Sequence, residues 1–486
     1  MIDVLVLVCY GLALAGLALY SLHRGWLLIT YRRARHRAAP DTHLRGQLPR
    51  VTVQLPIYNE RYVVARLLEA VSSLDYPRDR LQIQVLDDST DETSHLVARL
   101  VRERERRGLD IQHIRRGRRD GYKAGALAHG LERASGELIL ILDADFVPPS
   151  DLLRRLLPAF EDPRVGMAQA RWGHLNRDAS WLTRAQALIL DAHFQIEHGA
   201  RAAAGLFFNF NGTAGMWRKS CLLEAGGWQS DTLTEDLDLS YRAQLRGWRF
   251  VYLPDVVVPG ELPESVRALK GQQARWARGA MQTARKVLPE LLRGNWGWRV
   301  KLEAVAHLTS YVPSALTLAL ALLILPAAIV RFERGWPLLL FADLAFLAAA
   351  LGPLVCFYAE TLRACGRRAW PGAALALPSL LALGIGLSLN NTRALAQGMF
   401  GRRDPEFVRT PKRGNASRGY RPRSGWLGTA VEAVLAAYVA FAVGHALVNG
   451  LYPSIPFLLL FGWGFGAVAA GSVLDGSLRV RRGATG

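Results

Sequence analysis

Residues 137–145 read Glu-Leu-Ile-Leu-Ile-Leu-Asp-Ala-Asp, a short apolar run that ends in Asp143 and Asp145. Similar runs rich in Val, Ile and Leu lie at 51–56, 81–86 and 111–114. They are separated by amphipathic stretches of helical period at 61–73, 92–107 and 122–134. This alternation predicts an α/β domain over residues 50–260 with a largely parallel sheet.

Polar residues follow the ends of these runs, where ligands of such sheets bind. The candidates are Pro56, Tyr58 and Glu60 after the first run, Asp87 and Asp88 after the second, and Asp143 and Asp145 after the last. Residues i and i+2 of a strand face the same way, so Asp143 and Asp145 can together hold a hard divalent cation that neutralises a diphosphate. Capping or turn roles are the simpler interpretation of an Asp-x-Asp, but its place at the end of a strand favours the metal.

Residues 234–276 hold a second group of candidates. Asp236 lies in a Thr-Glu-Asp turn ahead of a predicted helix at 237–246. An Asp there is usually a helix cap, and its functional interpretation is a general base that removes a proton from an attacking hydroxyl. Gln272, Arg275 and Trp276 are spaced i, i+3, i+4 and share one helix face, on which Arg can bind phosphate and Trp can stack on a sugar ring.

Lys123 opens a predicted helix between Gly121 and Gly125, a place that suits a phosphate contact, although an ordinary exposed lysine is equally compatible with it. Together with the acidic turn and the helix face, it predicts glycosyl transfer from a nucleotide sugar.

Charge and hydropathy place the chain at a membrane. Half of its 486 residues are hydrophobic, yet it has 60 Lys+Arg against 41 Asp+Glu. The basic residues cluster at 32–50, 363–368, 393–423 and 479–482, beside apolar runs. That is the positive-inside pattern of a membrane protein, and it argues against a nucleic-acid groove.

The first apolar run, residues 4–22, approaches the roughly 30 Å hydrocarbon core at ~1.5 Å per residue. Positive charge follows it, so we expect a retained helix with its N-terminus outside and the next domain in the cytoplasm. Further apolar runs lie at 304–330, 337–358, 372–389, 427–448 and 453–474.

The third of these later runs, 372–389, is flanked by basic stretches at 361–371 and 393–425, which should both be cytoplasmic. We therefore expect 372–400 to lie along the membrane interface or to re-enter without crossing. The result is five crossings of the inner or plasma membrane with the C-terminus inside. The basic helix predicted at 264–292 is typical of a membrane-interface helix, with a buried domain-packing helix as the alternative.

The chain resembles the processive family 2 glycosyltransferases, the group of cellulose synthase, and most closely the cellulose-synthase-like A mannan and glucomannan synthases. The matching stretches run in order from 54 to 412 and are QLPIYNE, QIQVLDDSTDET, GYKAGAL, DADFVP, AQARW, FNGTAGMWR, EAGGW, TEDLDLSYRAQLRGWRFVY, ELPES, QQARW and EFVRTPK. The single helix ahead of the catalytic domain, and the lack of a visible regulatory domain after residue 475, make a second-messenger-controlled cellulose synthase a poorer match.

The resemblance implies an α/β fold: a cytoplasmic GT-A-type (Rossmann-like) domain at 32–262 after a transmembrane helix at 1–31. The expected remainder is an interfacial helix at 263–300, two transmembrane helices at 301–360, an interfacial or re-entrant segment with a gating-like loop at 361–425, two transmembrane helices at 426–476 and a cytoplasmic tail at 477–486.

The resemblance also implies residue roles. Asp87 or Asp88 would contact the nucleobase or ribose, and Asp143 and Asp145 would position the donor diphosphate with Mg²⁺ or Mn²⁺. Asp236 would be the catalytic base. The other expected donor contacts are Pro56, Tyr58, Glu60, Lys123, Gln272 and Arg275. The expected acceptor contacts are Asn211, Glu235 and Trp276, and the gating residues are Phe407, Arg409, Thr410 and Lys412.

We therefore predict a membrane-integral inverting glycosyltransferase that adds β-linked hexose from GDP-mannose or UDP-glucose to a growing glycan, with lipid bilayer and no nucleic acid as partner. One alternative is a non-processive enzyme that glycosylates a lipid such as ceramide or diacylglycerol. A second is a non-catalytic membrane export partner with a degenerate transferase domain.

Overall fold

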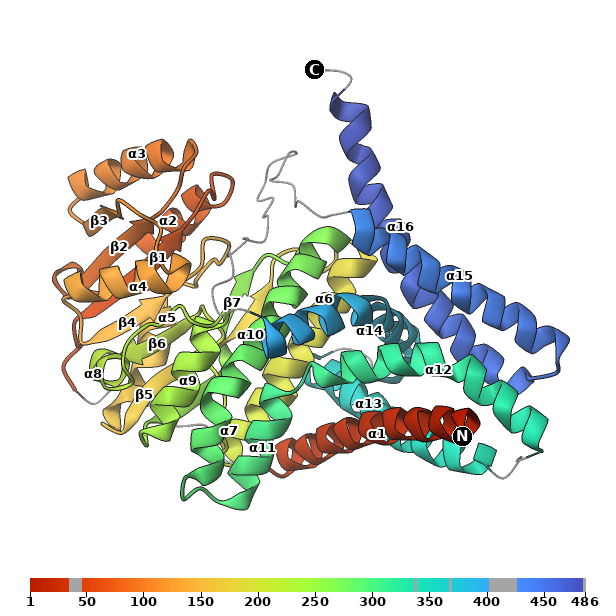
Figure 1. Cartoon of the computed structure of the whole chain (residues 1–486). Helices are drawn as coiled ribbons and strands as arrows, with labels where there is room; N and C mark the ends of the chain where they lie inside the picture. Colours follow the sequence, from red (N-terminus) through yellow and green to blue (C-terminus); the bar gives the residue numbers. More distant parts are fainter. Residues whose placement is uncertain (35–45, 336–338, 367–368, 402–425, 484–486) are drawn as a thin grey trace.

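The computed structural model describes residues 1–34, 46–335, 339–366, 369–401 and 426–483 (Figure 1). A sheet domain with helices on both faces lies on one side, and a bundle of long helices lies on the other. The helix α10 (Val266–Arg293) runs between the two parts.

Seven strands form one sheet in the order β3-β2-β1-β4-β6-β5-β7. They are β1 (Val51–Ile57), β2 (Leu81–Asp87), β3 (Asp110–Arg115), β4 (Leu138–Ile141), β5 (Val165–His174), β6 (Gly215–Arg218) and β7 (Arg249–Gly260). The first four strands are parallel, whereas β6 runs antiparallel to both β4 and β5. The expectation of a largely parallel sheet is correct for the first half of the domain, and the second half is mixed.

The strands read as continuous apolar runs because helices cover both faces of the sheet. One core packs α2 (Val64–Ser72), α3 (Thr93–Arg106) and α5 (Leu152–Leu156) on the sheet. The other packs α4 (Tyr122–Arg133), α8 (Lys219–Glu224) and α9 (Glu235–Leu245) on it. The short remaining elements of the domain are η1 (Arg78–Arg80), η2 (Leu157–Glu161), α6 (Trp181–Ala192), η3 (His193–His198) and α7 (Gly199–Ala203).

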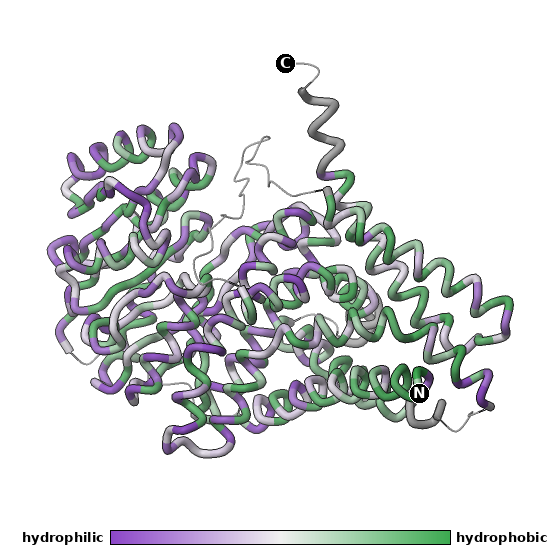
Figure 2. Tube along the Cα trace, in the orientation of Figure 1, coloured by the Kyte–Doolittle hydropathy of each residue, from purple (hydrophilic) through white to green (hydrophobic). Residues whose placement is uncertain are grey.

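The bundle contains α1 (Ile2–Ala34), α11 (Trp298–Leu308), α12 (Val312–Arg334), α13 (Leu339–Ala364), α14 (Ala369–Phe400), α15 (Trp426–Val448), η4 (Tyr452–Ser454) and α16 (Ile455–Gly483). Within the described ranges, five helical stretches are long and apolar enough to cross a membrane: Ile2–Ala34, Val312–Arg334, Ala345–Ala364, Leu427–Val448 and Tyr452–Asp475. They overlap the five apolar runs that we predicted to cross, and they support a membrane protein. Figure 2 shows their apolar character along the bundle.

The segment 372–400 belongs to α14, a single helix that packs along α10, α12 and α16. Asn390 Nδ2 donates a hydrogen bond to the Lys270 carbonyl oxygen of α10 at 3.0 Å. A Cβ on Gly398 would lie 2.6 Å from the Arg278 carbonyl oxygen, so the two helices approach closely there. On its other side α10 packs against α9, and it thereby joins the sheet domain to the bundle.

Candidate active site

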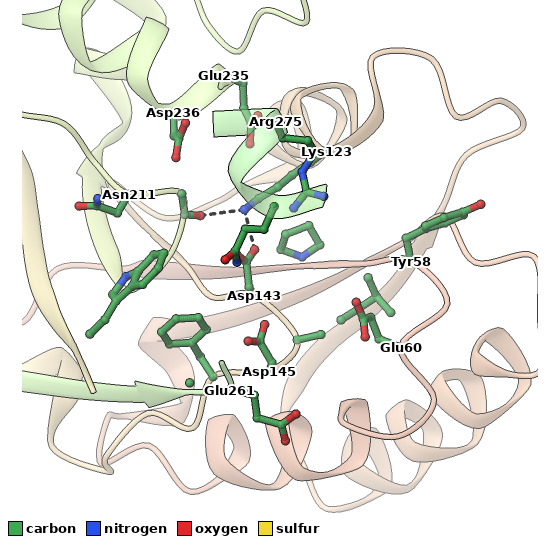
Figure 3. Close-up of a pocket in the computed structure, with 18 of the residues that line it drawn as sticks. Tyr58, Glu60, Lys123, Asp143, Asp145, Asn211, Glu235, Asp236, Glu261 and Arg275 are labelled. Carbon is green, nitrogen blue, oxygen red and sulfur yellow. Dashed lines mark hydrogen bonds and ion pairs between the residues drawn. The ribbon is translucent and has the colours of Figure 1, made fainter. Parts of the chain in front are cut away.

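A cavity lies at the carboxyl ends of β1, β2 and β4, beneath α9 and α10 (Figure 3). It brings together most of the residues predicted as site residues: Pro56, Tyr58, Glu60, Asp88, Lys123, Asp143, Asp145, Asn211, Glu235, Asp236, Gln272, Arg275 and Trp276. Separate strands and helices contribute them, so tertiary packing assembles the cavity.

Among the described residues, one predicted site residue, Asp87, is not in this lining. Asp87 is buried behind the end of β2, where it bonds His113 Nε2 at 2.8 Å and accepts from the Ser89 backbone N–H at 2.9 Å. Burial would raise the pKa of Asp87, but these hydrogen bonds hold it below its usual value. The gating residues Phe407, Arg409, Thr410 and Lys412 lie outside the described residues.

Asp88 lines the cavity with its carboxylate already engaged. Arg116 donates two hydrogen bonds to it, from Nε to Oδ1 at 3.0 Å and from Nη2 to Oδ2. The Arg116 Nη2 also donates to the Tyr122 carbonyl oxygen at the start of α4. This double contact fixes Asp88 to the loop that precedes Lys123.

Lys123 lies at the centre of the cavity. Its Nζ is 2.5 Å from Asp143 Oδ1 and donates to the Gly212 carbonyl oxygen at 2.9 Å (Figure 3). Burial alone would lower the pKa of Lys123, but the negative charges of Asp143, Glu235 and Asp236 raise it. Lys123 is therefore a fixed cation in an acidic pocket, ready to contact a diphosphate.

Glu235 and Asp236 lie in the first turn of α9, because the helix begins two residues earlier than the predicted start at residue 237. Burial, and then the charge of Glu235, raise the pKa of Asp236 to about 7, against the opposing effect of Lys123. Burial also raises the pKa of Glu235. A carboxylate with a pKa near neutrality suits a general base, because it accepts a proton readily and still ionises at working pH.

The α10 helix holds this turn directly. Gln282 Oε1 accepts from the Leu233 backbone N–H at 3.0 Å, and Thr283 Oγ1 lies 3.3 Å from Thr234 Oγ1. Gly279 leaves the space for the approach, since a Cβ there would lie 2.6 Å from the Thr234 side chain. The helix that carries Gln272, Arg275 and Trp276 is thus packed, through its following turns, on the turn that carries Asp236.

One turn earlier, α10 presents Gln272, Arg275 and Trp276 to the cavity, which confirms that the three residues share a face. Arg275 is half-buried, and the desolvation of its guanidinium lowers its pKa to about 10 despite the charges of Glu235 and Asp143. It still holds its positive charge at neutral pH. With Lys123 it gives the cavity two cations for a leaving diphosphate.

Asp143 and Asp145 test whether the site suits a divalent ion. Both line the cavity at the end of β4, but Lys123 occupies one oxygen of Asp143. Within the described chain, no group of three or more His, Cys, Asp or Glu side chains could hold a metal. Two carboxylates with ligands completed by phosphate oxygens fit Mg²⁺ or Mn²⁺, which prefers few protein carboxylates and bound phosphates.

Other residues of the cavity were not predicted. The Arg119 guanidinium stacks over the Tyr58 ring at 3.4 Å. Trp172 and His174 come from the end of β5, and Glu261 follows β7 and pairs with Arg66 at 2.7 Å. Trp172 and Glu261 belong to the quoted stretches AQARW and ELPES, so a signal was present, whereas Arg119 is one of several arginines in a basic loop with nothing to distinguish it.

Comparison with known proteins identifies a glycosyltransferase-like region over the same part of the chain. Residues 49–279 match the family described as glycosyltransferase-like family 2. The chain contains a family 2 glycosyltransferase domain. Its sheet, with ligand-side residues after β1, β2 and β4, is of the GT-A type.

Curated relatives are similar over this domain. Glucomannan 4-beta-mannosyltransferase 2 of Arabidopsis thaliana is 45% identical over 253 residues, which are 51% of this chain and 47% of that protein. Glucomannan 4-beta-mannosyltransferase 1 of Oryza sativa subsp. japonica is 41% identical over 291 residues, 58% and 56% of the two chains. The chain thus spans about half the length of the curated relatives that it matches.

Among solved structures, a mannosyltransferase from Pyrobaculum calidifontis in complex with GDP-Man and Mn²⁺ is similar with a TM-score of 0.50 and 25% identity. The match covers 74% of this chain and 99% of that one.

Proposed function

We propose that the chain is a membrane-integral inverting glycosyltransferase that transfers mannose from GDP-mannose to a growing β-linked glycan. The observation that supports this most strongly is that one cavity joins the half-buried Asp236 to the cations Lys123 and Arg275 and to the carboxylates Asp143 and Asp145. The printed names of the relatives and the GDP-Man in the neighbour favour mannose. UDP-glucose is the other donor to test.

In the proposed reaction, Asp236 accepts the proton of the acceptor hydroxyl as its oxygen attacks the anomeric carbon. The bond from that carbon to the diphosphate oxygen breaks on the opposite face, and the configuration inverts. Lys123 and Arg275 stabilise the negative charge that develops on the leaving diphosphate. A divalent ion held by Asp143 and Asp145 would supply further charge neutralisation there.

Trp276 lies on the same helix face as Arg275 and lines the same cavity. We assign it to stacking on the terminal sugar of the acceptor. Tyr58, Glu60 and Arg119 line the cavity near the ends of β1 and β3, where the nucleoside of the donor would lie.

The test is a donor panel with the purified full chain in detergent, including GDP-mannose and UDP-glucose, followed by linkage analysis. We expect β-linked mannose in a polymer with the intact protein and none with Asp236→Asn, which should still bind donor. Label in a solvent-extractable lipid would favour the lipid glycosyltransferase instead. Failure of the intact protein to consume any nucleotide sugar would refute an enzyme and favour the export partner.

We further propose that the five membrane-crossing helices place the N-terminus outside and both the catalytic domain and the C-terminus in the cytoplasm. Basic residues flank the apolar runs on the side that this orientation makes cytoplasmic. A C-terminal epitope should resist protease added outside intact cells and become sensitive after permeabilisation. Sensitivity in intact cells would overturn the orientation.

A further inference from the structure

Behind the wall of the cavity, the turn η3 replaces an ordinary helical turn with a π turn between α6 and α7. Such wide turns are rare and concentrate at functional sites. Its first residue, His193, points one ring nitrogen at the cavity wall: Nε2 lies 3.1 Å from Asn211 Nδ2. The other nitrogen, Nδ1, lies 3.0 Å from Glu197 Oε2 at the far end of the same turn.

These two contacts define the tautomer of His193. With the amide of Asn211 placed as it is in the structure, its Nδ2 donates to Nε2 of His193. Nδ1 then holds the ring proton and donates it to the Glu197 carboxylate. An imidazole ring whose second nitrogen contacts a carboxylate in this way is held in one orientation.

The carboxylate of Glu197 is itself held by charge. Arg201 Nη1 lies 3.6 Å from Oε2, and Arg24 Nε of the membrane helix α1 lies 3.7 Å from Oε1. Burial would raise the pKa of Glu197, but the hydrogen bond from His193 and the charges of Arg201 and Arg24 hold it well below its usual value. Glu197 therefore presents a charged acceptor to His193 Nδ1.

A second set of contacts ties the same place to α1. Arg201 Nε bonds Glu303 Oε1 at 2.7 Å, and Glu303 Oε2 bonds His23 Nε2 at 2.6 Å. The Arg201 and Glu303 side chains are almost fully buried, so their ion pair is shielded from water. From Asn211 through His193 and Glu197, a continuous chain of polar contacts reaches the first membrane helix.

Asn211 is where this chain meets the cavity. Asn211 lines the cavity, and the next residue, Gly212, lies close to Asp236 (Figure 3). A Cβ added to Gly212 would lie 2.9 Å from Asp236 Oδ2. The amide nitrogen of Asn211 is used by His193, while its carbonyl oxygen Oδ1 is buried and has no hydrogen-bond partner among the described residues. A buried carbonyl without a donor is costly, and a hydroxyl of a bound ligand would satisfy it.

We propose that His193 and Glu197 are positioning residues that fix the amide of Asn211, so that its carbonyl oxygen accepts a hydrogen bond from a hydroxyl of the acceptor sugar beside Asp236. This inference rests on the proposed function, because it assumes that a sugar occupies the cavity there. Arg24 extends the arrangement to α1, so the seating of the first membrane helix supports the acceptor site.

The test compares the full-length variants His193→Phe and His193→Gln with the intact chain. Phe removes the acceptor for Asn211, whereas Gln offers a side-chain oxygen in its place. We expect His193→Phe to raise the KM for a β-1,4-linked manno-oligosaccharide about five- to tenfold, the value of one neutral hydrogen bond, with the KM for GDP-mannose unchanged. His193→Gln should recover most of the loss.

His198→Phe is the matched control. His198 stacks on His193 with ring centroids 4.4 Å apart, but it bonds the backbone oxygen of Asn209 instead of Asn211. It should lower thermal stability without a selective change in acceptor KM. If the phenylalanine variant of His193 does not fold, the isosteric Glu197→Gln should show a smaller acceptor-specific increase. Equal effects of His193→Phe and His198→Phe on the acceptor KM would overturn the proposal. So would parallel changes in the KM values for the oligosaccharide and for GDP-mannose.

Direct binding separates this inference from the proposed function. Quenching of tryptophan fluorescence by the oligosaccharide and by GDP-mannose needs no turnover, and Trp172 and Trp276 line the cavity. An intact protein that transfers no hexose refutes the proposed function. Even then, oligosaccharide binding that weakens only in His193→Phe supports the positioning role, and oligosaccharide binding that is absent in the intact protein or equal in the variant refutes it.

Discussion

Replacement of Glu235 by Gln should lower the pH at which kcat/KM begins to fall on the acid side. Glu235 and Asp236 share the first turn of α9 and both line the cavity (Figure 3). The pKa of Asp236 is raised to about 7, first by burial and then by the charge of Glu235. Gln has nearly the same size as Glu and no charge, so the substitution removes the second cause and leaves the first.

The expected size follows from these causes. The pKa of Asp236 rises from the ordinary value of 3.8 to about 7, and burial takes the larger share. A neighbouring like charge contributes about one pH unit, or ~1.4 kcal/mol. Because Asp236 must be ionised to act as a base, kcat/KM of the intact enzyme should fall as pH drops below about 7, and in Glu235→Gln this fall should begin near pH 6.

The assay is GDP-mannose consumption from about pH 5 to pH 9 at fixed acceptor and metal, fitted for the position of the acid limb. Its position is informative even if the variant is slower, since Glu235 is also a proposed acceptor contact. Asp231→Asn is the control, because Asp231 pairs with Lys286 outside the cavity lining and its loss should leave the limb in place. Coincident limbs for Glu235→Gln and the intact enzyme would refute the electrostatic account of Asp236.

Asp236→Asn should be inactive yet more stable at alkaline pH. The folded pKa of Asp236 lies above its unfolded value, so the intact protein loses stability as pH rises from about 4 to about 7, on the order of 4 kcal/mol in all. Melting curves in detergent should therefore show a higher Tm for the variant than for the intact protein at pH 8 and no gain at pH 4. Equal Tm values of the two proteins at both pH values would contradict this. Arg275→Lys should make the rate fall at alkaline pH, with a midpoint near pH 8. The burial that lowers the pKa of Arg275 to about 10 would lower the pKa of a lysine at this position from ~10.4 by a similar amount. A rate that stays flat from pH 7 to 9 would argue against this prediction. Gly279→Ala should lower both activity and Tm, since the new Cβ would press on Thr234. Gly271→Ala, on the same helix but with no atom within 4 Å of the new Cβ, should leave both unchanged. Similar behaviour of the two variants would refute the close packing of α10 on the Thr234 turn.

Much of the site was predictable because its residues follow local signals. An apolar run that ends in carboxylates marks the end of a buried strand, and parallel strands bring such ends to one edge of a sheet. Asp88, Asp143 and Asp145 were located in this way. Helical spacing likewise placed Gln272, Arg275 and Trp276 on one face.

Other features depended on contacts that no local pattern encodes. Asp87 and Asp88 are neighbours in sequence, but only Asp88 lines the cavity, because Asp87 turns inward to His113 on the adjacent strand. The antiparallel strand β6 has only four residues, Gly215–Arg218, and nothing in them indicates the direction in which the strand runs. The role suggested for His193 depends on its distances to Asn211 and Glu197 across a π turn.

The sequence by itself determined the first four strands, the helices between them, the candidate membrane-spanning segments and the types of residue at the site, because burial, periodicity and charge are properties of short stretches of chain. Only the tertiary structure decided that α10 packs on the Thr234 turn through Gly279, so that Arg275 and Asp236 share one cavity. It also decided that burial raises the pKa of Asp236 to about 7. Desolvation and charge proximity depend on which distant segments pack together, and that is settled by the packing of the whole chain.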